Sequence, residues 1–151
     1  MSLASATVRD VMTSPVVTVE PSTLLLDAAL TLRSGSMRHL PVVEDGRLVG
    51  LISDRDIQRC APSRLIPITE EGYNAVFSDT PVSRVMTREP LSIPSDTTLI
   101  NAINLMQESR YGCLPVVEND ALVGILTRGD LVEILLRLLA GKPLARSLES
   151  S

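Results

Sequence analysis

The chain repeats one segment of itself, and this repeat limits its possible folds more than any other feature. Residues 8–57 align with residues 82–131 without a gap, so each residue of the first segment has a counterpart 74 positions later. The run Leu-Pro-Val-Val-Glu occurs identically at 40–44 and at 114–118, and a Leu-Val-Gly follows it each time. A gapless match of this kind indicates two copies of one supersecondary unit, which pack best about an approximate twofold axis.

Each copy is predicted to begin with a short strand and an amphipathic helix. The apolar or β-branched runs at 16–19 and 91–93 are typical of strands, and a Pro/Ser cluster ends each of them. A helix is expected next, with Asp96 as a candidate N-cap in the second copy. Its apolar residues recur at helical spacing on one face, namely Leu99, Ala102, Ile103 and Met106.

Each copy continues with a hairpin and a closing helix. Strands are expected at 40–43 and 48–52, because the Asp-Gly pair between them is a signal for a tight hairpin turn. The closing helices are expected to begin near Asp54 and near Arg128. Both copies therefore have the order βαββα, which makes the fold class α/β (α+β).

The repeats divide the chain into four predicted parts: repeat 1 at 8–60, a connecting segment at 61–81, repeat 2 at 82–140 and a C-terminal tail at 141–151. The connecting segment is expected to be an ordered loop with a short helical turn. The closing helix of repeat 2 is apolar over a wider arc than one core face needs. Either the connecting segment covers this arc, or the arc is an interface between copies of the chain.

Composition excludes several classes of function. Apolar residues make up 44% of the 151 residues and charged residues 21%, which is typical of a folded globular protein with an aliphatic core, since only three residues are aromatic. The net charge of −4 disfavours nucleic acid as a partner. No apolar run of about 18 residues and no secretory signal occurs, so we expect a cytoplasmic protein without a membrane partner. Two cysteines and one histidine argue against a disulfide framework or a zinc site.

The residues most suited to chemistry stand where each hairpin ends and each closing helix begins. Ser53 and Thr127 each have a carboxylate three positions later, Asp56 and Asp130. A hydroxyl at such a place can bond a phosphate or sugar oxygen, and the carboxylate can accept from vicinal ribose hydroxyls. The same spacing also predicts a capping box, in which both side chains bond the helix backbone. The two roles can coexist.

The whole layout resembles the family of cystathionine β-synthase-type (CBS) domains. Three duplicated motifs carry the resemblance: the Val-Met-Thr openings at 11–13 and 85–87, the two Leu-Pro-Val-Val runs, and the two Gly-x-x-Ser/Thr-x-x-Asp endings. The resemblance implies two βαββα repeats packed about a pseudo-twofold axis, with two clefts for adenosine ligands such as AMP, ADP, ATP or S-adenosylmethionine. It also implies a regulatory module without catalysis, acting on an unknown partner protein. Stand-alone members named for acetoin utilisation look most similar.

The family's arrangement implies which residues line each cleft. Aspartate would meet ribose, backbone and aliphatic side chains would hold adenine, and basic residues before the proline would meet phosphate. One cleft would use Ser53, Asp56, Leu91, Gly112, Cys113 and Pro115. The other would use Thr127, Asp130, Val17, Arg38, His39 and Pro41.

The copies differ before the Leu-Pro run, and this predicts a difference between the clefts. Arg38-His39 in the first copy correspond to Gly112-Cys113 in the second. Because Arg offers a bidentate fork to phosphate, we expect the Thr127/Asp130 cleft to suit a phosphorylated ligand better. An enzyme is disfavoured, since the chain has no Gly-rich phosphate loop and no nucleophile–base pattern. The remaining alternative is a ligand-free dimerisation or interaction module; a homodimer is expected in either case.

Overall fold

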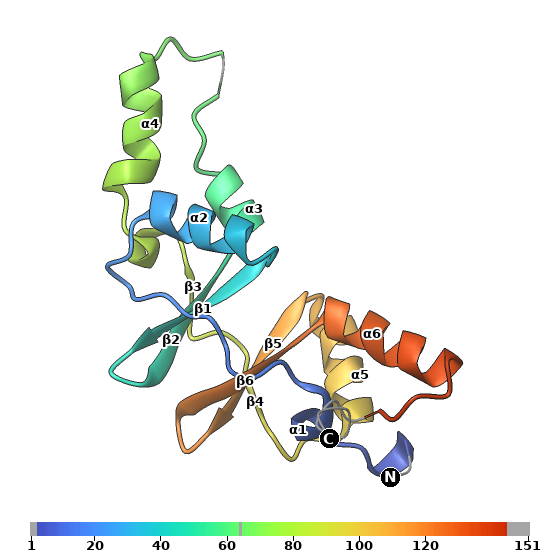
Figure 1. Ribbon diagram of the computed structural model, residues 1–151. Coiled ribbons are helices and arrows are strands. Elements are labelled where there is room, and N and C mark those ends of the chain that lie inside the picture. The colour runs from blue at the N-terminus through green and yellow to red at the C-terminus, as the bar shows by residue number, and fades with distance from the viewer. Residues whose placement is uncertain (1–2, 64, 145–151) are drawn as a thin grey trace. The chain divides into compact units, whose positions relative to one another are not determined.

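The computed structural model describes residues 3–63 and 65–144 as a mixed α+β protein that divides into two compact units (Figure 1). Among the described residues, unit 1 comprises 3–16 and 91–144, and unit 2 comprises 17–63 and 65–90. The predicted fold class is confirmed, with helices and a β-hairpin in each unit. Unit 1 joins the body of repeat 2 to residues 3–16, the opening segment of repeat 1. Unit 2 joins the body of repeat 1 to residues 82–90, the opening segment of repeat 2. This exchange decides which residues surround each hydroxyl–carboxylate pair.

Unit 1 is built around the hairpin of the second repeat. Strands β5 (Cys113–Glu118) and β6 (Ala121–Thr127) pair antiparallel, and the short β4 (Ile93–Pro94) runs parallel to β5. Two helices belong to this body, α5 (Leu99–Ser109) and α6 (Arg128–Leu139). The opening segment adds a short 3-10 turn, η1 (Leu3–Ser5), and the helical turn α1 (Val8–Val11).

Unit 2 repeats this arrangement with the first hairpin. Strands β1 (His39–Glu44) and β2 (Arg47–Ser53) pair antiparallel, and β3 (Thr87–Arg88) pairs with β2. Its helices are α2 (Leu25–Ser34), α3 (Asp54–Gln58) and α4 (Glu70–Asp79), with the 3-10 turn η2 (Val82–Arg84).

The two opening segments dock through corresponding backbone hydrogen bonds. The Val8 N–H donates to the Thr97 carbonyl at 2.9 Å, and the Val82 N–H donates to the Thr23 carbonyl at 2.7 Å. These donors and acceptors are related by the same 74-residue offset as the sequence repeat. Val8 and Val82 are both fully buried, so each opening segment completes the core of the unit that receives it.

Each unit has its own aliphatic core, as the composition predicts. In unit 1, Leu114, Val116 and Leu126 form the centre of a cluster together with Val8 and Val11. The corresponding hairpin residues, with Val82, form the core of unit 2. In both hairpins, alternate residues point to the opposite face. The residues that start β1 and end β2 therefore lie away from the core, where a ligand could reach them.

The connecting segment is more regular than the sequence prediction. A helix of ten residues, α4, begins after Thr69, whose hydroxyl accepts a hydrogen bond from the Gly72 N–H at 3.0 Å. Glu70 and Glu71 in the first turn favour the helix N-terminus. The helix packs against α2. The prolines that suggested a loop, Pro62, Pro67 and Pro81, all lie outside this helix.

Candidate functional site

In unit 1, Thr127 and Asp130 join the end of β6 to the first turn of α6. The Thr127 N–H donates to Asp130 Oδ2 at 2.8 Å, and the Asp130 N–H donates to Thr127 Oγ1 at 3.2 Å. These two bonds form the capping box that the spacing predicts. The box also fixes the carboxylate at the point where the strand ends. Asp130 is only 5% exposed and is the one buried charged residue among those that the structure describes.

A third residue, Thr13, also contacts this carboxylate. The Thr13 hydroxyl donates to Asp130 Oδ1 at 2.8 Å, although the two residues are 117 positions apart. Sequence reasoning did not assign Thr13 to a site. The duplicated Val-Met-Thr motif was the available signal, but it gave no indication that the opening of one repeat docks beside the closing helix of the other.

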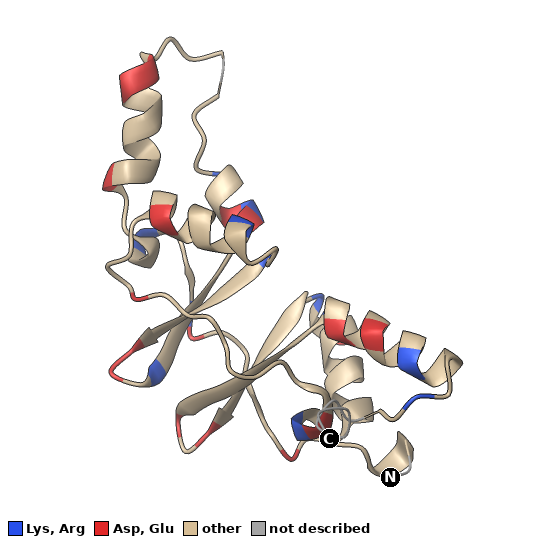
Figure 2. Ribbon diagram, in the orientation of Figure 1, with Lys and Arg blue, Asp and Glu red and all other residues tan. Residues whose placement is uncertain are grey.

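In unit 2, Ser53 and Asp56 make the corresponding capping box. The Ser53 N–H donates to Asp56 Oδ2 at 2.9 Å, and the Asp56 N–H donates to Ser53 Oγ at 3.1 Å. Figure 2 shows acidic and basic residues side by side on α3, where Arg55 lies between Asp54 and Asp56. Asp56 is only partly buried, so the two carboxylates differ in their exposure to solvent.

The basic pair of the first repeat lies beside Ser53. His39 is the register partner of Ser53 across the hairpin, and the Asp54 N–H donates to the Arg38 carbonyl at 3.0 Å. Since Leu40 faces the core, His39 and Ser53 share the opposite face. Unit 2 thus brings together one hydroxyl–carboxylate pair and the two basic residues that the sequence assigned to phosphate.

Unit 1 has neutral residues at these positions. Cys113 is the register partner of Thr127, and the Arg128 N–H donates to the Gly112 carbonyl at 3.2 Å. The structure therefore divides the predicted site residues by unit. Unit 1 holds Leu91, Gly112, Cys113, Pro115, Thr127 and Asp130, and unit 2 holds Val17, Arg38, His39, Pro41, Ser53 and Asp56. The cleft assignments made from the sequence combine residues of both sets, and they stay predictions.

Neither cysteine has the properties of a reactive thiol. Burial raises the pKa of Cys113 to about 12, and the side chain is 2% exposed. Burial, and then the nearby Asp56, raise the pKa of Cys60, whose thiol donates to the Asp56 carbonyl at 3.3 Å. Both thiols stay protonated near neutral pH, which disfavours nucleophilic catalysis and metal binding through them. Over residues 3–63 and 65–144, no cluster of three or more potential metal-binding side chains is found.

The outer face of α6 is apolar and exposed. Leu136 is 61% exposed and Leu139 is 77% exposed, and Val132 and Leu135 lie on the same helix with more than half of their surface accessible. Within unit 2, the helix α4 of the connecting segment packs against α2. The two explanations that the sequence left open for this arc, coverage by residues 61–81 and an interface between copies of the chain, both stay predictions. None of the helices in the described part of the chain is long and apolar enough to cross a membrane.

Comparisons with known proteins give a consistent result. The family model of the CBS domain matches residues 8–63 and again residues 82–137. A CBS domain-containing protein of Bacillus subtilis is 36% identical over 126 residues, which cover 83% of each chain. A Vibrio cholerae protein provisionally named for acetoin utilization has a similar structure, with a TM-score of 0.75 and 32% identity over 89% of this chain and 93% of that one. CBSX2 of Arabidopsis thaliana, solved in complex with AMP, gives a TM-score of 0.73 and 33% identity over 89% and 98% of the two chains.

Proposed function

Because this chain belongs to the CBS domain family, with the family model matching both of its repeats, we propose that it is a regulatory module that binds an adenosine ligand and has no catalytic activity of its own. The observation that carries the proposal is the pair of hydroxyl–carboxylate ends, Ser53/Asp56 and Thr127/Asp130. A fixed carboxylate beside a hydroxyl suits vicinal ribose hydroxyls. The AMP complex of a relative with 33% identity supports adenosine as the ligand class.

The proposed roles of the residues follow from their chemistry. Asp56 and Asp130 accept from ribose hydroxyls, and Ser53 and Thr127 bond a sugar or phosphate oxygen. Arg38, with His39 beside it, provides the positive charge that a phosphate requires. The other predicted residues, Val17, Pro41, Leu91, Gly112, Cys113 and Pro115, provide aliphatic surface and backbone for adenine. AMP, ADP, ATP and S-adenosylmethionine all share the adenosine part that these residues would recognise. The predicted cytoplasmic location fits such ligands.

Replacing Asp130 by Asn is expected to weaken adenosine-ligand binding, because Asn keeps the shape of the side chain but removes its charge. Losing a charged hydrogen-bond acceptor costs about 1.5–3 kcal/mol, or about 10- to 100-fold in affinity. Calorimetry with AMP, ADP, ATP and S-adenosylmethionine measures the change, and GTP tests the selectivity for adenine. Asp120→Asn, in the exposed hairpin turn, is the matched control and should bind as the natural chain does. If none of these ligands binds or stabilises the natural chain, the proposal fails.

The same measurements distinguish the contribution of the phosphate to affinity from that of the nucleoside. Arg38→Ala should weaken AMP binding and leave adenosine binding unchanged, if Arg38 contacts phosphate. The sequence assigns Arg38 to the ligand held by Asp130. Combining Arg38→Ala with Asp130→Asn should then give a non-additive loss for AMP, and combining it with Asp56→Asn should give an additive one. The reverse pattern would assign Arg38 to the Ser53/Asp56 ligand and overturn the predicted cleft.

A second function, association of two copies, is favoured by the exposed apolar face of α6. We propose that this face joins a homodimer, in which apolar burial provides the stability. Leu136→Glu is expected to convert the dimer into a monomer in sedimentation equilibrium, since a charge would be buried at the interface. Leu30→Glu is the control, because Leu30 is 54% exposed on α2 in the other unit. A natural chain that sediments as a monomer, or a Leu136→Glu chain that stays dimeric, would contradict the interface.

A further inference from the structure

The opening segment of the chain reaches the buried carboxylate of Asp130 and holds it from a second side. The Thr127 N–H fixes Oδ2, and the Thr13 hydroxyl fixes Oδ1. We propose that Thr13 is a positioning residue for Asp130, and that it makes this carboxylate the more selective of the two for ribose hydroxyls. The inference rests on the proposed function, since it concerns the ligand that Asp130 would bind.

The backbone around Thr13 is firmly placed. The Thr13 N–H donates to the Ile125 carbonyl at 2.9 Å, and the Ile125 N–H donates to the Thr13 carbonyl at 3.0 Å. The preceding Met12 lies directly on Gly124, where any added side-chain carbon would lie 2.3 Å from the methionine sulfur. The Thr13 side chain therefore has little freedom to move away from Asp130.

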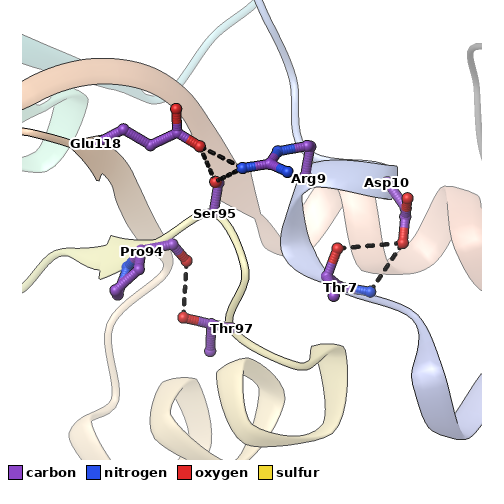
Figure 3. Close-up of polar contacts among 7 residues, drawn as sticks. All are labelled: Thr7, Arg9, Asp10, Pro94, Ser95, Thr97 and Glu118. Carbon is purple, nitrogen blue, oxygen red and sulfur yellow. Dashed lines mark hydrogen bonds and ion pairs between the residues drawn. The ribbon is translucent and has the colours of Figure 1, made fainter.

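A polar cluster anchors the same segment one helical turn earlier (Figure 3). Arg9 Nη2 donates to Ser95 Oγ at 2.6 Å and to Glu118 Oε1 at 2.5 Å, and the Ser95 hydroxyl also donates to Glu118. Ser95 is only 2% exposed, whereas the side chains of its partners Arg9 and Glu118 are 61% and 41% exposed. Hydrogen bonds from Ser95 and then from Arg9 lower the pKa of Glu118, which keeps the cluster charged. The cluster joins α1 to the end of β5 and to the residue that follows β4.

The described residues of unit 2 contain neither a hydroxyl bond to the carboxylate nor a charged cluster on the opening segment, although the backbone of that segment docks in the same way. The Ser83 N–H donates to the Pro21 carbonyl at 3.0 Å, as the Arg9 N–H donates to the Ser95 carbonyl at 3.0 Å. Ser83 and Pro21 cannot form the charged cluster. Thr87 corresponds to Thr13 but is exposed, and in the described parts of the chain its hydroxyl makes no hydrogen bond to Asp56. The side-chain contact is thus a property of unit 1 and not of the repeat.

This difference has a consequence for ligand recognition. Each carboxylate oxygen can accept more than one hydrogen bond, so the bond from Thr13 leaves acceptor capacity for a sugar hydroxyl. A carboxylate held from both sides loses little further freedom when a ligand binds, and it meets a diol in one orientation. Asp56 accepts from the Ser53 N–H but, among the described residues, from no side chain of the opening segment, and it is more exposed than Asp130. Removing one ribose hydroxyl should therefore cost more at Asp130 than at Asp56.

Calorimetry with AMP and 2′-deoxy-AMP tests this inference. In the natural chain, AMP is expected to bind about tenfold more tightly than 2′-deoxy-AMP, the effect of one hydrogen bond to a charged group. Thr13→Val removes only the hydroxyl and should reduce this ratio by several-fold at temperatures where the variant is folded. Thr13→Ser keeps the hydroxyl and should restore the ratio. Thr87→Val, the same change at the corresponding position of the other unit, should leave it unchanged.

The possible results distinguish this inference from the proposed function. If Thr13→Val binds AMP and 2′-deoxy-AMP with the natural ratio, Thr13 does not position Asp130, whatever it does for stability. The same conclusion follows if Thr87→Val lowers the ratio as much as Thr13→Val. If the natural chain binds neither nucleotide, nor any other adenosine ligand, the proposed function is wrong and the inference falls with it.

Discussion

Replacing Val8 by Asp is expected to unfold the body of the second repeat, although Val8 belongs to the first repeat in sequence. Val8 is completely buried in the core of unit 1, beside residues of α5, β5 and β6. A lone carboxylate cannot be satisfied there, and the expected loss in the free energy of unfolding is about 3–5 kcal/mol. A change of this size is comparable with the whole stability of many domains.

Hydrogen exchange of the backbone amides shows which unit the substitution destabilises. Val8→Asp should deprotect amides at 93–134, in unit 1, more than those at 25–57. Val82→Asp is the matched variant, because Val82 is equally buried in the core of unit 2. It should deprotect amides at 25–57 first. If Val8→Asp instead exposes its own repeat, residues 25–57, the exchange of opening segments between the units is wrong.

The body of each repeat could be predicted because its signals are local. The Leu-Pro-Val-Val run and its turn predicted strands at 40–43 and 48–52, and these lie within β1 and β2. The alternation of core and outward residues and the turn chemistry specify a hairpin without reference to the rest of the chain. Ser53 and Thr127 were likewise predicted as the N-caps of their helices, and both capping boxes are confirmed.

The first strand of each copy, and the start of the first helix in the second copy, were less accurately predicted. The run at 16–19 forms only an isolated bridge, between Val19 and Val42, and the run at 91–93 contributes only Ile93 to β4. Strands this short have too few pairing residues for a periodic signal. Asp96 is not the N-cap of α5. Thr98 takes this place, with its hydroxyl accepting from the Asn101 N–H at 3.3 Å, so the helix begins two residues later than a cap at Asp96 would allow.

The exchange of opening segments could not be predicted from the repeat itself. Val8 and Val82 are the same residue at corresponding positions, so either copy of the opening would fit either core. The choice depends on chain connectivity and on contacts at positions where the copies differ, such as Arg9 with Ser95 and Glu118. The contribution of Thr13 to the Asp130 site was missed for the same reason. The repeat indicates that an opening segment packs on a hairpin, but it does not indicate whether that hairpin belongs to the same copy or to the other copy.

The effects of substitutions at Met12 and at Gly124 on stability are expected to depend on each other. Measuring this dependence tests how the opening segment packs on β6. At Gly124, an added Cβ would lie 2.3 Å from Met12 Sδ and 2.9 Å from Met12 Cγ. Gly124→Ala should therefore lower the free energy of unfolding by about 1–3 kcal/mol, because Met12 has to move out of its place on β6. Urea unfolding monitored by circular dichroism measures the loss.

The decisive comparison is the same substitution in a Met12→Ala background. Met12→Ala removes the sulfur and Cγ, so Gly124→Ala should then cost much less, and the two changes should be strongly non-additive. Gly129→Ala is the control in the same unit, since its Cβ would meet only Thr127 Oγ1 at an ordinary 3.5 Å. It should be neutral or stabilising, because Ala has the higher helix propensity. An equal cost of Gly124→Ala in both backgrounds would mean that the backbone at Gly124, and not the packing of Met12 on it, requires glycine.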